Sequence, residues 1–272
     1  MTTKTTTSAD GSTIAYEVTG SGPALVLVDG ALCYREMGPS KDLAAALSDK
    51  FTVYRYDRRG RGESTIAKPA TPGTAEAVEQ EVADLGAVIE AAGGHAYLLG
   101  QSSGAALALE AARAELSIDA ILAYEAPFIL DDTHEPNDAD LGERVEKLAE
   151  SGRRAAAVEL FLRTVGMPWV AVKVMRLTPA FKKLSAVAHT LPYDFSIVLP
   201  FEQGLPLPRN YYERVKMPVL SVAGSKSPTY MTNAQQAISK AVPDGRYLVL
   251  DGQNHMVTAG ALAPVATEFF TA

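Results

Sequence analysis

The chain has 272 residues, of which 47% are hydrophobic and 21% charged, so it can bury a large core and lacks the composition of a disordered protein. Its formal net charge of −7 argues against nucleic acid or an anionic membrane surface as the main partner. A single cysteine excludes an internal disulfide framework and a cysteine-based metal cluster.

Short apolar runs alternate with helical patterns along most of the chain. The first two predicted strands, Lys4–Ser8 and Thr13–Thr19, flank Asp10-Gly11, a dipeptide that favours a tight hairpin turn. Six further runs have the length and composition of buried strands: Ala24–Val28, Phe51–Tyr56, Ala96–Leu99, Ala120–Tyr124, Pro218–Ala223 and Arg246–Leu250. Helices are predicted between them at Pro39–Leu47, Thr74–Ala92, Ser102–Glu115, Asn233–Val242 and Leu262–Phe270. The alternation predicts an α/β fold with a mainly parallel, eight-stranded sheet flanked by helices.

One long stretch interrupts this alternation. Residues 128–216 contain no convincing strand and instead show four helical patterns, at Leu141–Glu150, Arg153–Val165, Trp169–Arg176 and Ala180–Thr190, followed by a Pro-rich segment through Pro208. An all-helical insertion between two strands indicates a cap over the carboxyl ends of the strands, where open α/β sheets bind their ligands. We therefore predict a core domain made of residues 1–127 and 217–272, with a helical cap at 128–216.

Targeting and membrane signals are missing from the chain. No apolar run approaches the roughly 18 residues of a transmembrane helix, and the Thr-rich first ten residues lack the order of a signal peptide. We expect a soluble, cytoplasmic protein that acts on a small molecule and binds neither nucleic acid nor membranes. The sequence leaves the oligomeric state open, with a homodimer as one option.

The pentapeptide Gly100-Gln101-Ser102-Ser103-Gly104 directly follows one predicted strand and opens a predicted helix. A G-x-S-x-G nucleophile turn requires this context, because its glycines let the strand and the helix approach closely. The serine hydroxyl would lie exposed at a helix N-terminus, where developing negative charge is stabilised. We predict Ser102 as a nucleophile and the backbone N–H of Ser103 as half of an oxyanion hole. The alternative is a Gly/Ser-rich turn that only caps a helix.

A serine nucleophile needs a general base, and the chain offers four histidines. His95 precedes a strand, His134 lies in an acidic loop and His189 lies within a predicted cap helix, so these three suit structural or solvated roles. His255 differs because it follows the last predicted strand, in a loop on the same sheet edge as the nucleophile turn. We predict His255 as the base.

With this strand order, nucleophile turn and late histidine, the sequence resembles the α/β-hydrolase superfamily along essentially the whole chain. The segment Tyr56–Ser64 is similar to the loop that follows the fourth strand in that superfamily, and we expect it to be structural and to pack beside the active site. In most members the triad acid follows the seventh strand. Here that turn reads Gly224-Ser225-Lys226-Ser227-Pro228 and contains no carboxylate.

Some members of the superfamily take the acid from the end of the sixth strand, and this chain has Glu125 there. Burying a glutamate at the end of an apolar strand is costly without a partner, and an imidazolium is a suitable one. Two alternatives stay open: Glu125 could form a salt bridge to a cap arginine, and Asp251, four residues before His255, could supply the acid. We predict that Glu125 is the acid and that Ser227 has no catalytic role.

The end of the first central strand is a second departure from the superfamily. Most members have His-Gly there, whereas this chain has Asp29-Gly30, followed by Ala31. The backbone N–H of Gly30 or Ala31 should supply the second oxyanion donor. A carboxylate would oppose the charge that this hole stabilises, so we expect Asp29 to point away, toward backbone amides or Arg58.

Taken together, the Asp-Gly strand end, the Ser-Ser-Gly turn, the glutamate after the sixth strand and the acid-free turn after the seventh resemble the zearalenone lactonase group. Members of that group open a resorcylic macrolactone with a Ser–Glu–His triad. The resemblance implies a serine hydrolase that cleaves a small apolar carboxylic ester or lactone, with no metal and no cofactor. Two other functions remain open: a cofactor-free lyase or C–C bond hydrolase with the same triad, and a non-catalytic ligand-binding member.

Overall fold

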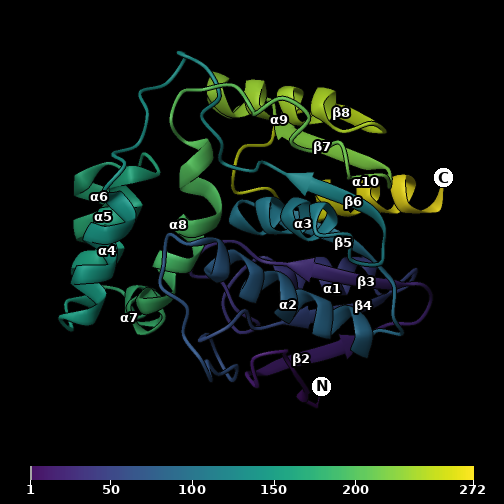
Figure 1. Ribbon diagram of the computed structural model, residues 1–272, viewed down its shortest axis with the longest axis horizontal. Helices are drawn as coiled ribbons and strands as arrows, with labels where there is room; N and C mark the ends of the chain where they lie inside the picture. Colours follow the sequence, from purple (N-terminus) through teal and green to yellow (C-terminus); the bar gives the residue numbers. More distant parts are fainter. Residues whose placement is uncertain (1) are drawn as a thin grey trace.

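The structure of the protein is a computed structural model, and residues 2–272 are described. Its eight strands form one sheet in the order β1-β2-β4-β3-β5-β6-β7-β8. β2 pairs antiparallel with both β1 and β4, and all other neighbours run parallel (Figure 1). The strands are β1 (Lys4–Thr7), β2 (Thr13–Thr19), β3 (Ala24–Val28), β4 (Thr52–Tyr56), β5 (Ala96–Gln101), β6 (Ile118–Tyr124), β7 (Val219–Gly224) and β8 (Gly245–Leu250).

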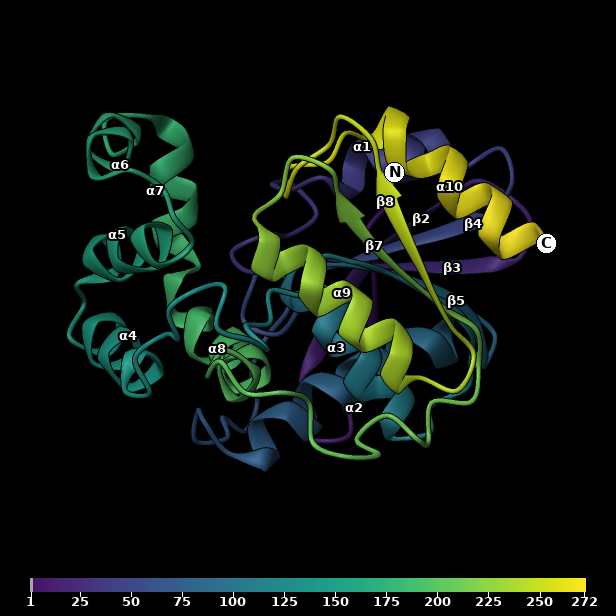
Figure 2. The same ribbon diagram turned by 90° about the horizontal axis from the view of Figure 1, so that it is seen from above.

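Helices cover both faces of this sheet (Figure 2). On one face, α1 (Ser40–Leu47) and α10 (Ala259–Thr271) pack into one hydrophobic cluster with the strands. On the other face, α2 (Ala75–Ala91), α3 (Ser103–Arg113) and α9 (Thr229–Ala241) contribute to a second, larger cluster. The central strands are buried on both sides, which explains their unbroken apolar runs. The predicted α/β fold class is confirmed.

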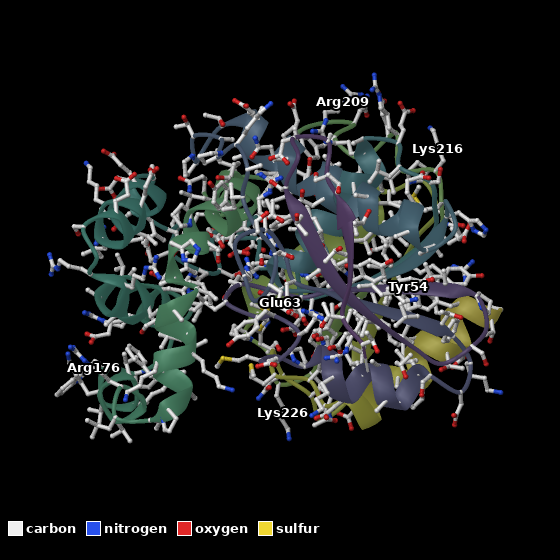
Figure 3. The ribbon with its side chains drawn as sticks, turned by 90° about the horizontal axis from the view of Figure 1, so that it is seen from below. Tyr54, Glu63, Arg176, Arg209, Lys216 and Lys226 are labelled. Carbon is white, nitrogen blue, oxygen red and sulfur yellow. The ribbon has the colours of Figure 1, made fainter. Side chains whose placement is uncertain are left out.

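Between β6 and β7 the chain leaves the sheet and forms a helical insert, hereafter the cap. Its helices are α4 (Leu141–Glu150), α5 (Arg154–Thr164), α6 (Trp169–Met175), α7 (Pro179–Ala186), η1 (Ala188–Thr190), α8 (Leu191–Val198) and η2 (Leu199–Phe201). The cap lies beyond the carboxyl ends of the strands, with α8 between the other cap helices and the core (Figure 1). Figure 3 shows Arg176 at the outer edge of the cap, well away from Tyr54 of β4. No helix in residues 2–272 has the length and hydropathy needed to cross a bilayer.

One part of the cap prediction was wrong. The single helix expected at Ala180–Thr190 is split, and the Pro-rich segment, for which no helix was predicted, contains α8. Pro192 is compatible with α8 because it lies in the first turn, where no intrahelical N–H bond is required. All eight residues of α8 are buried. A helix enclosed on every side has no polar face, so the usual 3.6-residue pattern is missing from its sequence.

Candidate active site

Ser102 lies in a tight turn between β5 and α3, at the carboxyl edge of the sheet. Its backbone angles are φ 56° and ψ −127°, a strained combination for an L-residue that costs about 1–3 kcal/mol. A Cβ atom at Gly104 would lie 2.1 Å from the Val28 carbonyl oxygen, and one at Gly100 would lie 2.6 Å from the Gly104 carbonyl oxygen. Both positions therefore require glycine, and the turn presents the serine at the N-terminus of α3.

His255 and Glu125 form a hydrogen-bonded pair beside this turn. His255 Nδ1 lies 2.8 Å from Glu125 Oε2, although the two residues are 130 positions apart in the chain. The glutamate is fully buried, and its other carboxylate oxygen accepts a hydrogen bond from the Gly224 backbone N–H at 2.7 Å. The histidine side chain is 37% exposed. A bond at Nδ1 orients the ring and leaves Nε2 free to exchange a proton.

Backbone contacts join the nucleophile turn to the strand that precedes Glu125. The Ser102 N–H donates to the Tyr124 carbonyl at 2.9 Å. The Tyr124 hydroxyl donates to the Asn254 carbonyl at 2.7 Å, which holds the loop that carries His255. The sequence prediction missed this role, for which the only signal was a tyrosine at the end of a buried strand. Within residues 2–272 no hydrogen bond joins the Ser102 hydroxyl to the His255 ring, and such contacts often tighten only when substrate binds.

The other candidate acids occupy different surroundings. Asp251 lies on the surface, where its carboxylate accepts a hydrogen bond from the Ser225 hydroxyl at 3.1 Å. Ser227 has a buried hydroxyl oxygen with no hydrogen-bond partner in the described part of the chain. Glu125 forms its ion-pair contact with His255 and not with a cap arginine. The geometry therefore favours Glu125 over the alternatives that the sequence left open.

Three backbone N–H groups in or next to the nucleophile turn have no hydrogen-bond acceptor in residues 2–272. Gly30 packs so closely against it that a Cβ atom there would lie 3.0 Å from Ser102 Cβ and 3.5 Å from Ser102 Oγ. The N–H groups of Gly30, Ala31 and Ser103 donate no hydrogen bond to any atom of residues 2–272. Unpaired donors beside a nucleophile, at the positive end of a helix, are what an oxyanion hole requires.

Asp29 is buried directly before this glycine. Its carbonyl oxygen lies 3.4 Å from Arg58 Nη1 and accepts a hydrogen bond from it. Burial raises the pKa of the Asp29 carboxyl from 3.8 to about 6, and the positive charges of nearby arginines, with Arg61 the strongest, offset only part of this effect. The carboxyl therefore gains or loses its charge in mildly acidic solution.

Asp29→Asn is expected to stabilise the protein at pH 8 and to change little at pH 4. At pH 4 the carboxyl is almost fully protonated in the folded chain and about 40% protonated in the unfolded chain, so the pKa difference has little effect on stability there. Above pH 6 the folded wild type must keep an ionised carboxylate in its interior, whereas asparagine carries no charge. A difference of roughly two pKa units corresponds to a gain of up to about 3 kcal/mol in unfolding free energy at pH 8.

Urea denaturation of wild type and variant at the two pH values measures this linkage. Asp132→Asn, at an exposed carboxylate, is the control and is expected to show the same small effect at both. An equal change in stability at pH 4 and pH 8 for Asp29→Asn would mean that the carboxyl does not titrate as described.

The other three histidines form no hydrogen bond with Ser102, Glu125 or His255 in residues 2–272. His95 Nδ1 lies 2.7 Å from Asp119 on the surface, and His134 Nδ1 lies 2.7 Å from the Glu135 carbonyl oxygen. His189 belongs to η1 in the cap. In residues 2–272 no three side chains of His, Cys, Asp or Glu are grouped so that they could hold a metal ion. The candidate groups at this edge of the sheet are Ser102, His255 and Glu125, with the backbone N–H groups around them.

Comparisons with known proteins agree with this architecture. A family model described as "Alpha/beta hydrolase family" matches residues 20–268. The chain is 40% identical to an alpha/beta hydrolase from Sphaerobacter thermophilus whose crystal structure superposes with a TM-score of 0.88, with coverage of 98% of this chain and 100% of that one.

Two more distant solved structures share the fold. A thermophilic esterase from Thermogutta terrifontis is 20% identical, with a TM-score of 0.68 and coverage of 100% of this chain and 98% of that one. An enol-lactonase from Burkholderia xenovorans is 18% identical, with a TM-score of 0.69 and coverage of 99% and 100%. At this identity the likeness concerns the fold, which can support more than one reaction.

Proposed function

Because the chain belongs to the alpha/beta hydrolase family, we propose that it is a serine hydrolase that cleaves a carboxylic ester or lactone through an acyl-enzyme. The observation that carries this proposal is the hydrogen bond between His255 and the fully buried Glu125, at the sheet edge that presents Ser102. Burying a carboxylate is unfavourable unless its charge is compensated, and an imidazole that becomes cationic during a reaction provides that compensation.

In the proposed reaction His255 Nε2 removes the hydroxyl proton of Ser102 as Oγ attacks the carbonyl carbon of the substrate. Glu125 keeps the ring oriented and stabilises its cationic form. The carbonyl oxygen becomes an oxyanion that accepts hydrogen bonds from the N–H of Ser103 and of Gly30 or Ala31. His255 then gives the proton to the leaving alkoxide as the C–O bond breaks.

The same groups then hydrolyse the acyl-enzyme. His255 deprotonates a water molecule, which attacks the acyl carbon, and the proton returns to Ser102 Oγ as the ester bond to the enzyme breaks. With a lactone, the alcohol and the acid remain parts of one molecule. The net change is the addition of one water.

Apolar esters and lactones are the proposed substrate class. Met256, which directly follows His255, is largely exposed. Apolar surface next to a reactive histidine suits an apolar substrate. A resorcylic macrolactone of the zearalenone type is the first lactone to test, because the sequence resembles that group of lactonases in its nucleophile turn and in Glu125.

A fluorophosphonate probe is expected to label Ser102 in the wild type and to give no label after Ser102→Ala. A panel of chromogenic esters, simple lactones and zearalenone, followed by mass spectrometry, then identifies the reaction. Hydrolysis is expected to add about 18 mass units, one water, to a lactone. Absence of labelling would favour a non-catalytic ligand-binding protein. Labelling together with products that contain no added water would favour a lyase.

A further inference from the structure

Asp194, in the first turn of α8, is a buried carboxylate that the proposed reaction does not use. Its Oδ1 accepts hydrogen bonds from Arg58 Nη1 and from Ser103 Oγ, each at 2.7 Å. Its Oδ2 accepts a hydrogen bond from Arg61 Nη2 at 2.6 Å. Both guanidinium groups are completely buried. One cap carboxylate thus binds three groups of the core that lie around the nucleophile turn.

The two arginines continue from this carboxylate to the backbone that flanks Ser102. Arg61 Nη1 donates to the Gly30 carbonyl at 2.8 Å, and Arg58 Nη1 donates to the Asp29 carbonyl at 3.4 Å. Residues 2–272 contain no cis peptide bond, and in a trans peptide the N–H points opposite to the C=O. These two bonds therefore aim the N–H groups of Ala31 and Gly30 away from the arginines.

The other side of the oxyanion hole is attached to the same carboxylate. The Ser103 hydroxyl donates to Asp194 Oδ1 and also accepts a hydrogen bond from Arg58 Nη1 at 3.2 Å. Ser103 is the first residue of α3, and its backbone N–H is one of the proposed oxyanion donors. Its side chain thus anchors the start of that helix to α8 of the cap.

We propose that Asp194 is a positioning residue of the oxyanion hole. Its ionised carboxylate, which comes from the cap, fixes the peptides of Gly30 and Ala31 and the start of α3 at Ser103, so that their N–H groups keep their positions relative to the Ser102 hydroxyl. This inference rests on the proposed hydrolase function. It assigns a role in the reaction to the buried arginines of the loop after β4, which the sequence marked only as structural. It also makes the cap part of the machinery that stabilises the transition state.

The charge of the carboxylate is suited to this role. Burial by itself raises the pKa of Asp194, but the charges of Arg61 and Arg58 and the hydrogen bond from Ser103 outweigh it and leave that pKa below its ordinary value of 3.8. The side chain therefore stays ionised wherever the protein is folded near neutral pH. A neutral side chain of the same shape would weaken the hold on both arginines.

Asp194→Asn is the direct test, because it keeps the shape of the side chain and removes its charge. We expect kcat toward the best ester of the panel to fall about 10- to 100-fold while KM changes little, since oxyanion contacts act mainly in the transition state. A boronic acid that forms a tetrahedral anion on Ser102 should lose affinity by a similar factor. The pH dependence of kcat should keep its midpoint, because the histidine pair is untouched.

Asp84→Asn is the matched control. Asp84 is also fully buried and binds an arginine of the same loop, Arg59, through two hydrogen bonds of 2.7 and 2.8 Å. These two hydrogen bonds join Asp84 and Arg59 to each other and do not involve the nucleophile turn. The control is expected to keep the kcat and the boronate affinity of the wild type. Equal kcat in the two variants would overturn the positioning role.

Ser103→Ala keeps the backbone N–H donor, and it tests the positioning role of Asp194 if Asp194→Asn does not fold. It removes only the hydroxyl that links α3 to Asp194, and we expect kcat to fall about 3- to 10-fold with a parallel loss of boronate affinity. If neither quantity changes in this variant, the inference is wrong. A wild-type protein that hydrolyses no ester and takes no fluorophosphonate label would instead refute the proposed function itself.

Discussion

Glu125→Gln is expected to lower kcat by about 10³- to 10⁴-fold while leaving the fold intact. Glutamine has the same shape, so it can still accept the Gly224 N–H bond and fill the buried position. It lacks the negative charge that stabilises the imidazolium of His255, and its amide can favour the wrong ring tautomer. Steady-state kinetics on the best ester of the panel, together with thermal unfolding, measure both parts of the expectation.

Two controls separate Glu125 from the other positions where an acid could act. Ser227→Ala and Asp251→Asn are each expected to keep kcat within about threefold of the wild type, because neither side chain is hydrogen-bonded to His255 or Glu125. Activity that survived Glu125→Gln would move the acid to Asp251 or elsewhere. A large loss in Asp251→Asn would point the same way.

Ser102→Gly is expected to remove nearly all turnover, by about 10⁶-fold, and at the same time to stabilise the protein. The turn holds Ser102 at φ 56° and ψ −127°, which an L-residue adopts only under strain, whereas glycine adopts it readily. Glycine removes the backbone strain but loses more conformational entropy on folding than serine does. The net effect should raise the unfolding free energy by about 1 kcal/mol.

Ser102→Ala is the matched variant for this test. It removes the same hydroxyl but keeps Cβ, so it should lose turnover equally and gain no stability from the backbone. The two variants, compared by urea denaturation and by residual activity, separate the nucleophile from the strain of its turn. Equal stability of the glycine and alanine variants would show that the turn is not strained by its side chain.

Much of the fold follows from local patterns in the sequence. Apolar runs of strand length alternate with amphipathic helices, and this alternation alone specifies a parallel sheet covered on both faces. The cap was recognisable from the absence of strands between β6 and β7. Helix α8 was not, because it is buried on every side and carries a proline in its first turn. An amphipathic pattern reveals a helix only when one face of the helix is polar and exposed, and α8 has no such face.

The candidate site also has features that local sequence patterns reveal and features that depend on contacts between distant residues. A serine between two glycines, placed between a strand and a helix, is readable in the chain because the turn is made of consecutive residues. The glutamate at the end of β6 and the histidine after β8 could each be named as candidates. Their pairing was predicted only through the resemblance to family members that take the acid from this strand. Local patterns alone could not predict it, because the hydrogen bond joins residues 130 positions apart through loops whose paths depend on how the whole sheet packs.

The sequence by itself determined the α/β class, the nucleophile turn and the identities of the groups able to act as base and acid. Only the tertiary structure decided that Glu125 and not Asp251 contacts His255, and that Asp194 of the cap reaches Arg58, Arg61 and Ser103. Residue types and short spacings record what a segment can do locally. Which distant segments meet is decided by burial, because a charged group is stable inside the protein only where the fold brings it a partner.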